Sequence, residues 1–178
     1  MKKRTIAIEL TTEGIERAIN ELNAYKQELV QKTETLRKRV AELLANEARQ
    51  GFNSAIVDDL INDSKRIAQV DVSVDNNGDV TLVIADSKDA KKMDAVWVEF
   101  GTGVYHNGSP GSSPHPNGAE LGFTIGGFGE GRGKRQVWGF KEDGVLKLTH
   151  GTPAKMPMAR AVSSVINDIQ SIVQEVFG

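Results

Sequence analysis

The chain contains residue types that often carry chemistry, but their spacing does not match a reactive site. Its three histidines are His106, His115 and His150, and none has a second ligand at i+2 or i+4, the spacing of zinc motifs on strands and helices. Cysteine is absent, which excludes thiolate nucleophiles, disulfides and cysteine-held metals. We therefore expect a protein that is not an enzyme and has no bound metal and no cofactor.

A glycine-rich segment is the second place to look for a ligand site. Of the 18 glycines, 14 lie between Gly101 and Gly151. A phosphate-binding P-loop requires G-x-x-x-x-G-K-[ST]. Aligned on Gly133 and Lys134, this pattern has Phe128 in place of the first glycine and Arg135 in place of the hydroxyl residue. Nucleotide binding is therefore not expected.

A small basic cluster lies in the same segment. Arg132, Lys134 and Arg135 alternate with glycine near Phe128 and Trp138, as cations and aromatics do in proteins that bind single strands. Three charges give weak affinity at physiological salt. The formal charge of −2 and the pI near 6.0 provide no general attraction to nucleic acid or an anionic membrane. The cluster is either a weak nucleic-acid site or a solvated hairpin tip.

The elements that would position these residues follow from hydrophobic periodicity. Alternation predicts a strand over Thr5–Leu10, and apolar spacings of three and four predict a long helix from Thr12, its N-cap, to Gly51. Two hairpins are predicted at the turn sequences Asn76-Asn77-Gly78 and Glu142-Asp143-Gly144. Their strands are 66–75 with 79–85 and 136–140 with 145–149.

A closing helix is predicted from Pro157, which suits a first helical turn. We expect it to pack on the sheet through Val162, Val165, Ile166, Ile169 and Val173. The predicted fold is α+β: an antiparallel sheet with the long N-terminal helix and the C-terminal helix packed on it. A single domain spans 1–178, with an extended Gly/Pro-rich loop over 104–135, and no apolar window is long enough for a membrane span.

Several short motifs together resemble one known family, the head–tail connection family of tailed bacteriophages, whose members include tail completion proteins. The similarity extends from about Ala48 to the final helix, and its specific parts are the two ends. These are Glu99-Phe100-Gly101-Thr102-Gly103 and His150-Gly151-x-Pro153-Ala154-x-x-Pro157-Met158. Many members carry A-P-V-D-T-G-x-L after the long helix, whereas this chain has Gly51-Phe-Asn-Ser-Ala-Ile-Val-Asp-Asp-Leu60, so any role of that segment does not transfer.

The resemblance implies a structural virion protein of the neck or upper tail, assembled in the cytoplasm of a bacterial host. It implies a ring of copies, expected to be a hexamer. Its neighbours would be the adaptor or stopper, the tail terminator or the tail tube, with DNA contact in the lumen and no membrane contact. The alternative function is a nucleic-acid-binding accessory protein that uses the basic cluster.

The partner-binding residues are expected in the glycine loop and its hinge. We expect the turns after Glu99 and after His150 to lie side by side, with glycines allowing positive φ and close backbone approach and with Glu99 bonded to His150. The alternative is that these turns define the fold without touching a partner. Tyr105–Arg135 is expected to be mobile in the free subunit and ordered on assembly. The candidate residues are Glu99, Gly101, Gly103, Tyr105, Phe123, Phe128, Arg132, Lys134, Arg135, Trp138, His150 and Pro153.

Overall fold

The computed structural model describes residues 5–57, 66–101, 105–106, 109–110, 115–118, 120–121, 137–149, 151–152 and 154–178. Its three helices and eight strands confirm the α+β class. The helices are α1 (Thr12–Asn53), α2 (Asp94–Phe100) and α3 (Pro157–Phe177). The strands are β1 (Ile56–Val57), β2 (Arg66–Ile67), β3 (Val70–Asn77), β4 (Val80–Ser87), β5 (Tyr105–His106), β6 (Ser109–Pro110), β7 (Trp138–Glu142) and β8 (Val145–Thr149).

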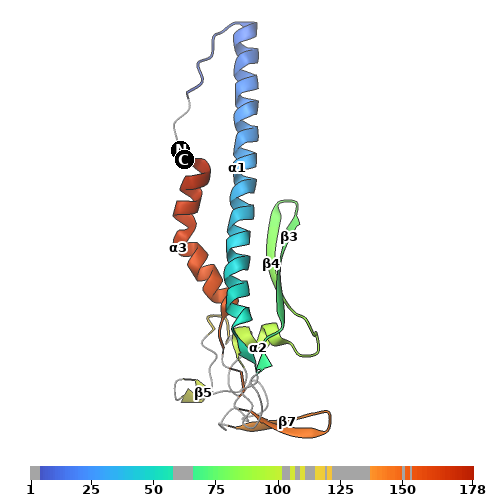
Figure 1. The fold of residues 1–178 in the computed structure, drawn as a ribbon. Helices are drawn as coiled ribbons and strands as arrows, with labels where there is room; N and C mark the ends of the chain where they lie inside the picture. The colour runs from blue at the N-terminus through green and yellow to red at the C-terminus, as the bar shows by residue number, and fades with distance from the viewer. Residues whose placement is uncertain are drawn as a thin grey trace.

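Helix α1 is the spine of the molecule (Figure 1). Its 42 residues extend over about 63 Å at the usual rise per residue. The N-cap is Thr11 rather than Thr12, because the Thr11 hydroxyl oxygen accepts the Gly14 N–H at 3.1 Å. The predicted first strand is wrong: residues 5–9 form no strand, because no other segment of the described chain pairs with them.

Gly51 lies inside α1, not at its end as predicted. A Cβ at this position would lie 2.6 Å from Cβ of Pro157, the first residue of α3. The glycine is therefore explained by the close approach of two helices, and α1 continues for two more residues.

The described strands form four separate two-stranded antiparallel units, and do not join into the single sheet that we expected. The main hairpin, β3–β4, pairs Val74 with Val83 and turns at Gly78, whose φ is 58°. The β7–β8 hairpin turns at Asp143 and Gly144, both with positive φ. Both hairpin turns are confirmed where the sequence predicted them.

The core lies where α1, α2, β1 and the start of β3 meet. Phe52, Val57 and Val98 are almost fully buried, and the alanines of the last turns of α1 let the neighbouring elements approach closely. The hairpin β3–β4 packs on one side of α1, and α3 packs on another (Figure 1). The buried cluster consists of Ala45, Ala48, Phe52, Ala55, Val57, Ala68, Val70, Val72, Ala95, Val98 and Ala161.

The face of α3 that packs differs from the predicted one. Helix α3 lies against α1 rather than on a sheet, and its buried residues are Pro157, Ala161, Val165 and Ile172. Of the predicted set only Val165 is buried, whereas Ile166 is 62% exposed. The small Ala161 side chain permits the tight α1–α3 contact, so the bulkier stripe next to it points outward.

Among the described residues, no helix combines the length and the hydropathy that a bilayer crossing requires.

Candidate interaction surface

The structure describes four of the predicted site residues: Glu99 and Gly101 fully, and Tyr105 and Trp138 through their backbone in β5 and β7. The other predicted residues lie outside the described residues: Gly103, Phe123, Phe128, Arg132, Lys134, Arg135, His150 and Pro153. The same holds for most of the glycine loop.

Glu99 caps the start of α3 from another element. Its carboxylate accepts the Met158 N–H at 2.8 Å and the Ala159 N–H at 2.9 Å. The residue at the N-cap, Met156, has a left-handed backbone and offers no side-chain acceptor. Because the free N–H groups of a helix start are the positive end of its dipole, a buried carboxylate is stabilised there.

All four N–H positions of that first turn are accounted for. Pro157 has no N–H, Met158 and Ala159 bind Glu99, and the Arg160 N–H binds the Met156 carbonyl oxygen at 2.9 Å. The sequence did not reveal this cap, because 59 residues separate Glu99 from Met158.

His115 also binds Glu99, a contact that the sequence analysis did not predict. Its Nε2 lies 3.1 Å from Oε1 of Glu99, and its ring centroid lies 4.3 Å from that of Phe100. The His115 Nδ1 accepts the Asn117 N–H at 3.1 Å, so Nε2 carries the proton that Glu99 accepts. His150 lies outside the described residues.

The two glycine turns meet as predicted. Gly101 has a φ of 80°, and a Cβ there would lie 3.0 Å from the Ala154 backbone nitrogen. The Lys155 N–H donates to the Val98 carbonyl oxygen at 2.8 Å, and Gly151 has a φ of 90°. We call this meeting of 98–101 with 151–159 the α2–α3 junction.

A second buried carboxylate holds the other end of α2. Asp94 is almost fully buried and binds both terminal nitrogens of Arg66, at 2.6 and 2.9 Å, together with the Gln69 N–H at 3.0 Å. This bidentate geometry is the strongest that an arginine and a carboxylate form. Asp94 therefore fixes the start of β3 to α2.

These contacts correct one predicted role. Glu99 is only 6% exposed and both of its oxygens bind donors of the same chain, so it cannot present a charge to a partner. Glu99 and Gly101 define the fold, which was the alternative interpretation of these turns.

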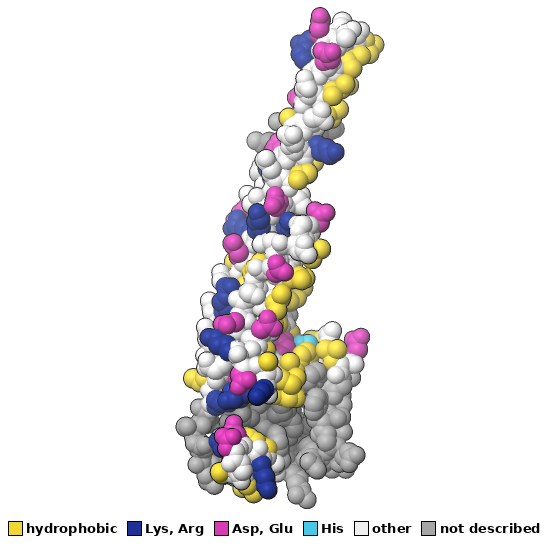
Figure 2. Space-filling model, turned by 90° about the vertical axis from the view of Figure 1, so that its right-hand side faces the viewer, with side chains coloured by type: hydrophobic (Ala, Val, Ile, Leu, Met, Phe, Trp, Pro, Cys, Tyr) yellow, Lys and Arg dark blue, Asp and Glu magenta, His cyan; other side chains and the backbone are white. Residues whose placement is uncertain are grey.

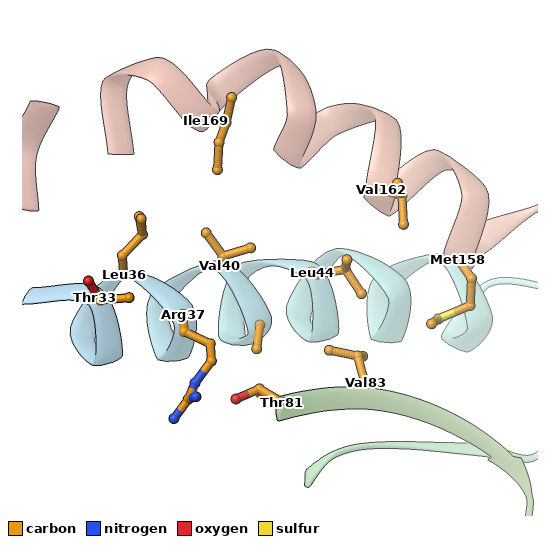
Figure 3. Close-up of a pocket in the computed structure, with 11 residues that line it drawn as sticks. Thr33, Leu36, Arg37, Val40, Leu44, Thr81, Val83, Met158, Val162 and Ile169 are labelled. Carbon is orange, nitrogen blue, oxygen red and sulfur yellow. The ribbon is translucent and has the colours of Figure 1, made fainter. Parts of the chain in front are cut away.

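The described surface has an apolar hollow between α1, α3 and β4. A groove of about 480 Å³ opens there, and its lining is mostly apolar (Figure 3). Leu36, Val40 and Leu44 of α1 form its floor, and Val162 and Ile169 of α3 form one wall. Arg37, Thr81 and Val83 lie on the opposite side, where β4 passes.

The outer face of α3 continues this apolar surface. Ile166 and Val173 are both exposed, one helical turn beyond the groove wall. Sequence periodicity showed that these residues were apolar, but it could not show that another face of α3 packs against α1.

One polar atom of the groove has no partner. Within the described part of the chain, Nε of Arg37 is the one buried side-chain nitrogen or oxygen without a hydrogen bond. A buried guanidinium nitrogen without an acceptor is unfavourable, so the groove lacks an acceptor in the isolated chain.

Comparisons with protein-family models, with curated proteins and with solved structures find no match to this chain.

Proposed function

We propose that this protein is a structural subunit of a tailed-phage or prophage particle, located at the head–tail neck or upper tail. It acts without catalysis, by packing against copies of itself and against neighbouring neck or tail proteins. The motif resemblance suggests the particle, and the surface of the structure supports an assembly role.

One observation carries the assembly role: the apolar outer face of α3. Ile166 and Val173 are exposed beside an apolar groove, although nearby positions of the same helix are buried against α1. Single exposed hydrophobic residues are common, but a continuous apolar surface on a folded helix is typical of a protein interface. The fixed α2–α3 junction gives this face a rigid support.

The test is genetic complementation of a phage or prophage that encodes the chain. Deleting the gene should leave filled heads and unattached tails, and the wild-type chain supplied in trans should restore infectious particles. An Ile166→Glu chain should restore few or none, because a charge on the outer face of α3 opposes burial in an interface.

Gln170→Glu is the matched control, because it adds the same charge at an exposed polar position of the same helix. It should complement like the wild type. Both purified variants should unfold like the wild type. Normal particles formed without the gene would contradict the proposal.

A further inference from the structure

The N-terminal half of α1 carries an apolar ridge that packs against no described element of the chain. Ile15, Ile19 and Leu22 are 45%, 51% and 51% exposed. In Figure 1 this part of α1 extends beyond both α3 and the β3–β4 hairpin. Figure 2 shows hydrophobic side chains gathered along one edge of the rod, from its upper end downward. We call these three residues the N-terminal ridge.

The ridge belongs to a heptad pattern that continues into the groove. Ile or Leu recurs at every seventh residue, and Ile19 and Val40 occupy the intervening positions, where Lys26 and Thr33 are the polar exceptions. We call this line of heptad positions along α1 the seam. Two of its residues, Leu36 and Val40, line the groove. One helix face is therefore a free ridge at one end and a groove floor at the other. The seventh residues are Ile15, Leu22, Leu29, Leu36 and Leu43.

The charges of α1 differ between these two ends. Residues 12–28 contain four glutamates and two basic residues, whereas residues 31–53 contain five basic residues and three glutamates. The ridge thus lies on an acidic half-helix and the groove floor on a basic one. Opposite charges attract when two such helices lie antiparallel, and like charges meet when they lie parallel.

The seam residues favour the same orientation. In a parallel pair Lys26 would face Lys26 of the other helix, and Lys32 would face Arg37 across the seam. In an antiparallel pair, Glu16 comes beside Arg37 instead. Opposite charges therefore flank the seam in the antiparallel orientation.

We propose that the occupant of the groove is a second copy of this chain, paired antiparallel through α1 about a two-fold axis. The ridge of each copy lies in the groove of the other, with Ile15 against Val40 and Ile19 against Leu36 of the second copy. The overlap from residue 15 to residue 40 is about 39 Å long. The same contact occurs twice because the interface is isologous.

Sedimentation equilibrium of the full chain tests the pairing. The wild type should have twice the chain mass of 19.3 kDa, and Leu22→Glu should weaken the dimer by roughly 100-fold, because a charge would be buried in the seam. The matched control is Asn20→Glu, on the far side of the same helix, which should remain a dimer. A monomeric wild type at tens of micromolar would overturn the proposal.

A charge exchange tests whether the partner is the chain itself. Arg37→Glu alone and Glu16→Arg alone should each weaken the dimer, and the double variant should restore it, because both partners of the pair then change sign. A foreign partner with an acidic helix would not be rescued in this way. Failure of the double variant to recover dimerisation would overturn the pairing of Glu16 with Arg37.

Engineered cysteines test the direction, because the natural chain has none. Residues 19 and 36 are about 25 Å apart along one helix, too far for a disulfide within one chain. In the antiparallel pair, the Ile19→Cys, Leu36→Cys variant should form a covalent dimer on oxidation, and Ile19→Cys alone should not. Cross-linking of the single variant would show a parallel pair and overturn the model.

The outcome of these three association tests does not depend on the proposed phage role. A monomeric chain that still complements the deletion would leave the proposed function intact.

Discussion

The two ends of α1 differ in how their side chains are used. Near the C-terminal end of the helix, Phe52 packs with Val57 and Val98, and the buried carboxylates Asp94 and Glu99 bind donors from other segments. Near the N-terminal end, the ridge residues have the same chemical character as the core but remain at the surface. The C-terminal end is buried within one chain, whereas the apolar side chains of the N-terminal end are exposed, and the proposed pairing of two chains would bury them.

Substitution in the core should have the largest effect on unfolding. Phe52→Ala removes an aromatic ring that is 1% exposed, and we expect a loss of about 3 to 5 kcal/mol in the free energy of unfolding. Urea denaturation of the purified variant measures it. A loss below about 1 kcal/mol would mean that the two ends of α1 do not differ as described.

Removing the remote cap should cost somewhat less. Glu99→Ala leaves the Met158 and Ala159 N–H groups without their acceptor, and we expect a loss of about 2 to 4 kcal/mol. Glu99→Gln is the matched control, since it keeps one oxygen acceptor and should be less damaging. Equal losses for the two variants in urea denaturation would show that the acceptor is not what stabilises α3.

A methyl group at the α1–α3 crossing should have an intermediate effect. Gly51→Ala places a Cβ 2.6 Å from that of Pro157, which forces the helices apart and should cost about 1 to 3 kcal/mol. The matched control is Gln50→Ala, which changes an exposed residue of the same helix next to Gly51 and should leave the stability nearly unchanged. Unchanged thermal stability of Gly51→Ala would argue against the close crossing.

Truncation on the outer face of α3 should barely change the stability of a single chain. Ile166→Ala removes atoms that water already contacts, and we expect less than about 1 kcal/mol. The measurement belongs at low protein concentration, where association contributes least. A loss as large as that of Phe52→Ala would place Ile166 in the core and contradict the comparison.

The smallest effect is expected for an exposed pair on the β7–β8 hairpin. The Lys147 ammonium donates a hydrogen bond to Glu142 and lowers the pKa of that carboxyl below its ordinary 4.5. A lowered carboxyl pKa stabilises the fold above the ordinary value and loses this effect as the pH falls through the folded value. Glu142→Gln should therefore lower the melting temperature slightly at pH 7 and not at pH 3.

Local signals were the part of this fold that the sequence could predict. The turns at Gly78 and at Asp143-Gly144 depend on positive φ, which the residue types themselves favour, and Pro157 opens a helix for an equally local reason. The strand predicted at residues 5–10 failed because alternation cannot supply a pairing neighbour. The alternation of residues 5–10 favours a strand, but no described strand lies beside them to pair with.

Relations between distant segments could not be predicted. Helix α3 has apolar residues on two adjacent faces, so periodicity alone does not say that Ala161 and Val165 face α1 while Ile166 points outward. The Glu99 cap joins residues far apart in the chain, and no spacing rule detects such a contact. For the candidate surface, the sequence supplied the apolar residues of α1 and α3, and the fold decided which of them remain exposed.

The α2–α3 junction also affects how this chain can vary. Gly101 and Ala154, which bound residues 102–153, lie side by side and are held by the same few contacts. Closing a longer segment between fixed ends adds only about 0.6 kcal/mol per doubling of length. Lengthening the chain between these two fixed points therefore costs little chain entropy, as long as the residues that pack on the junction, such as His115 and Thr152, are kept.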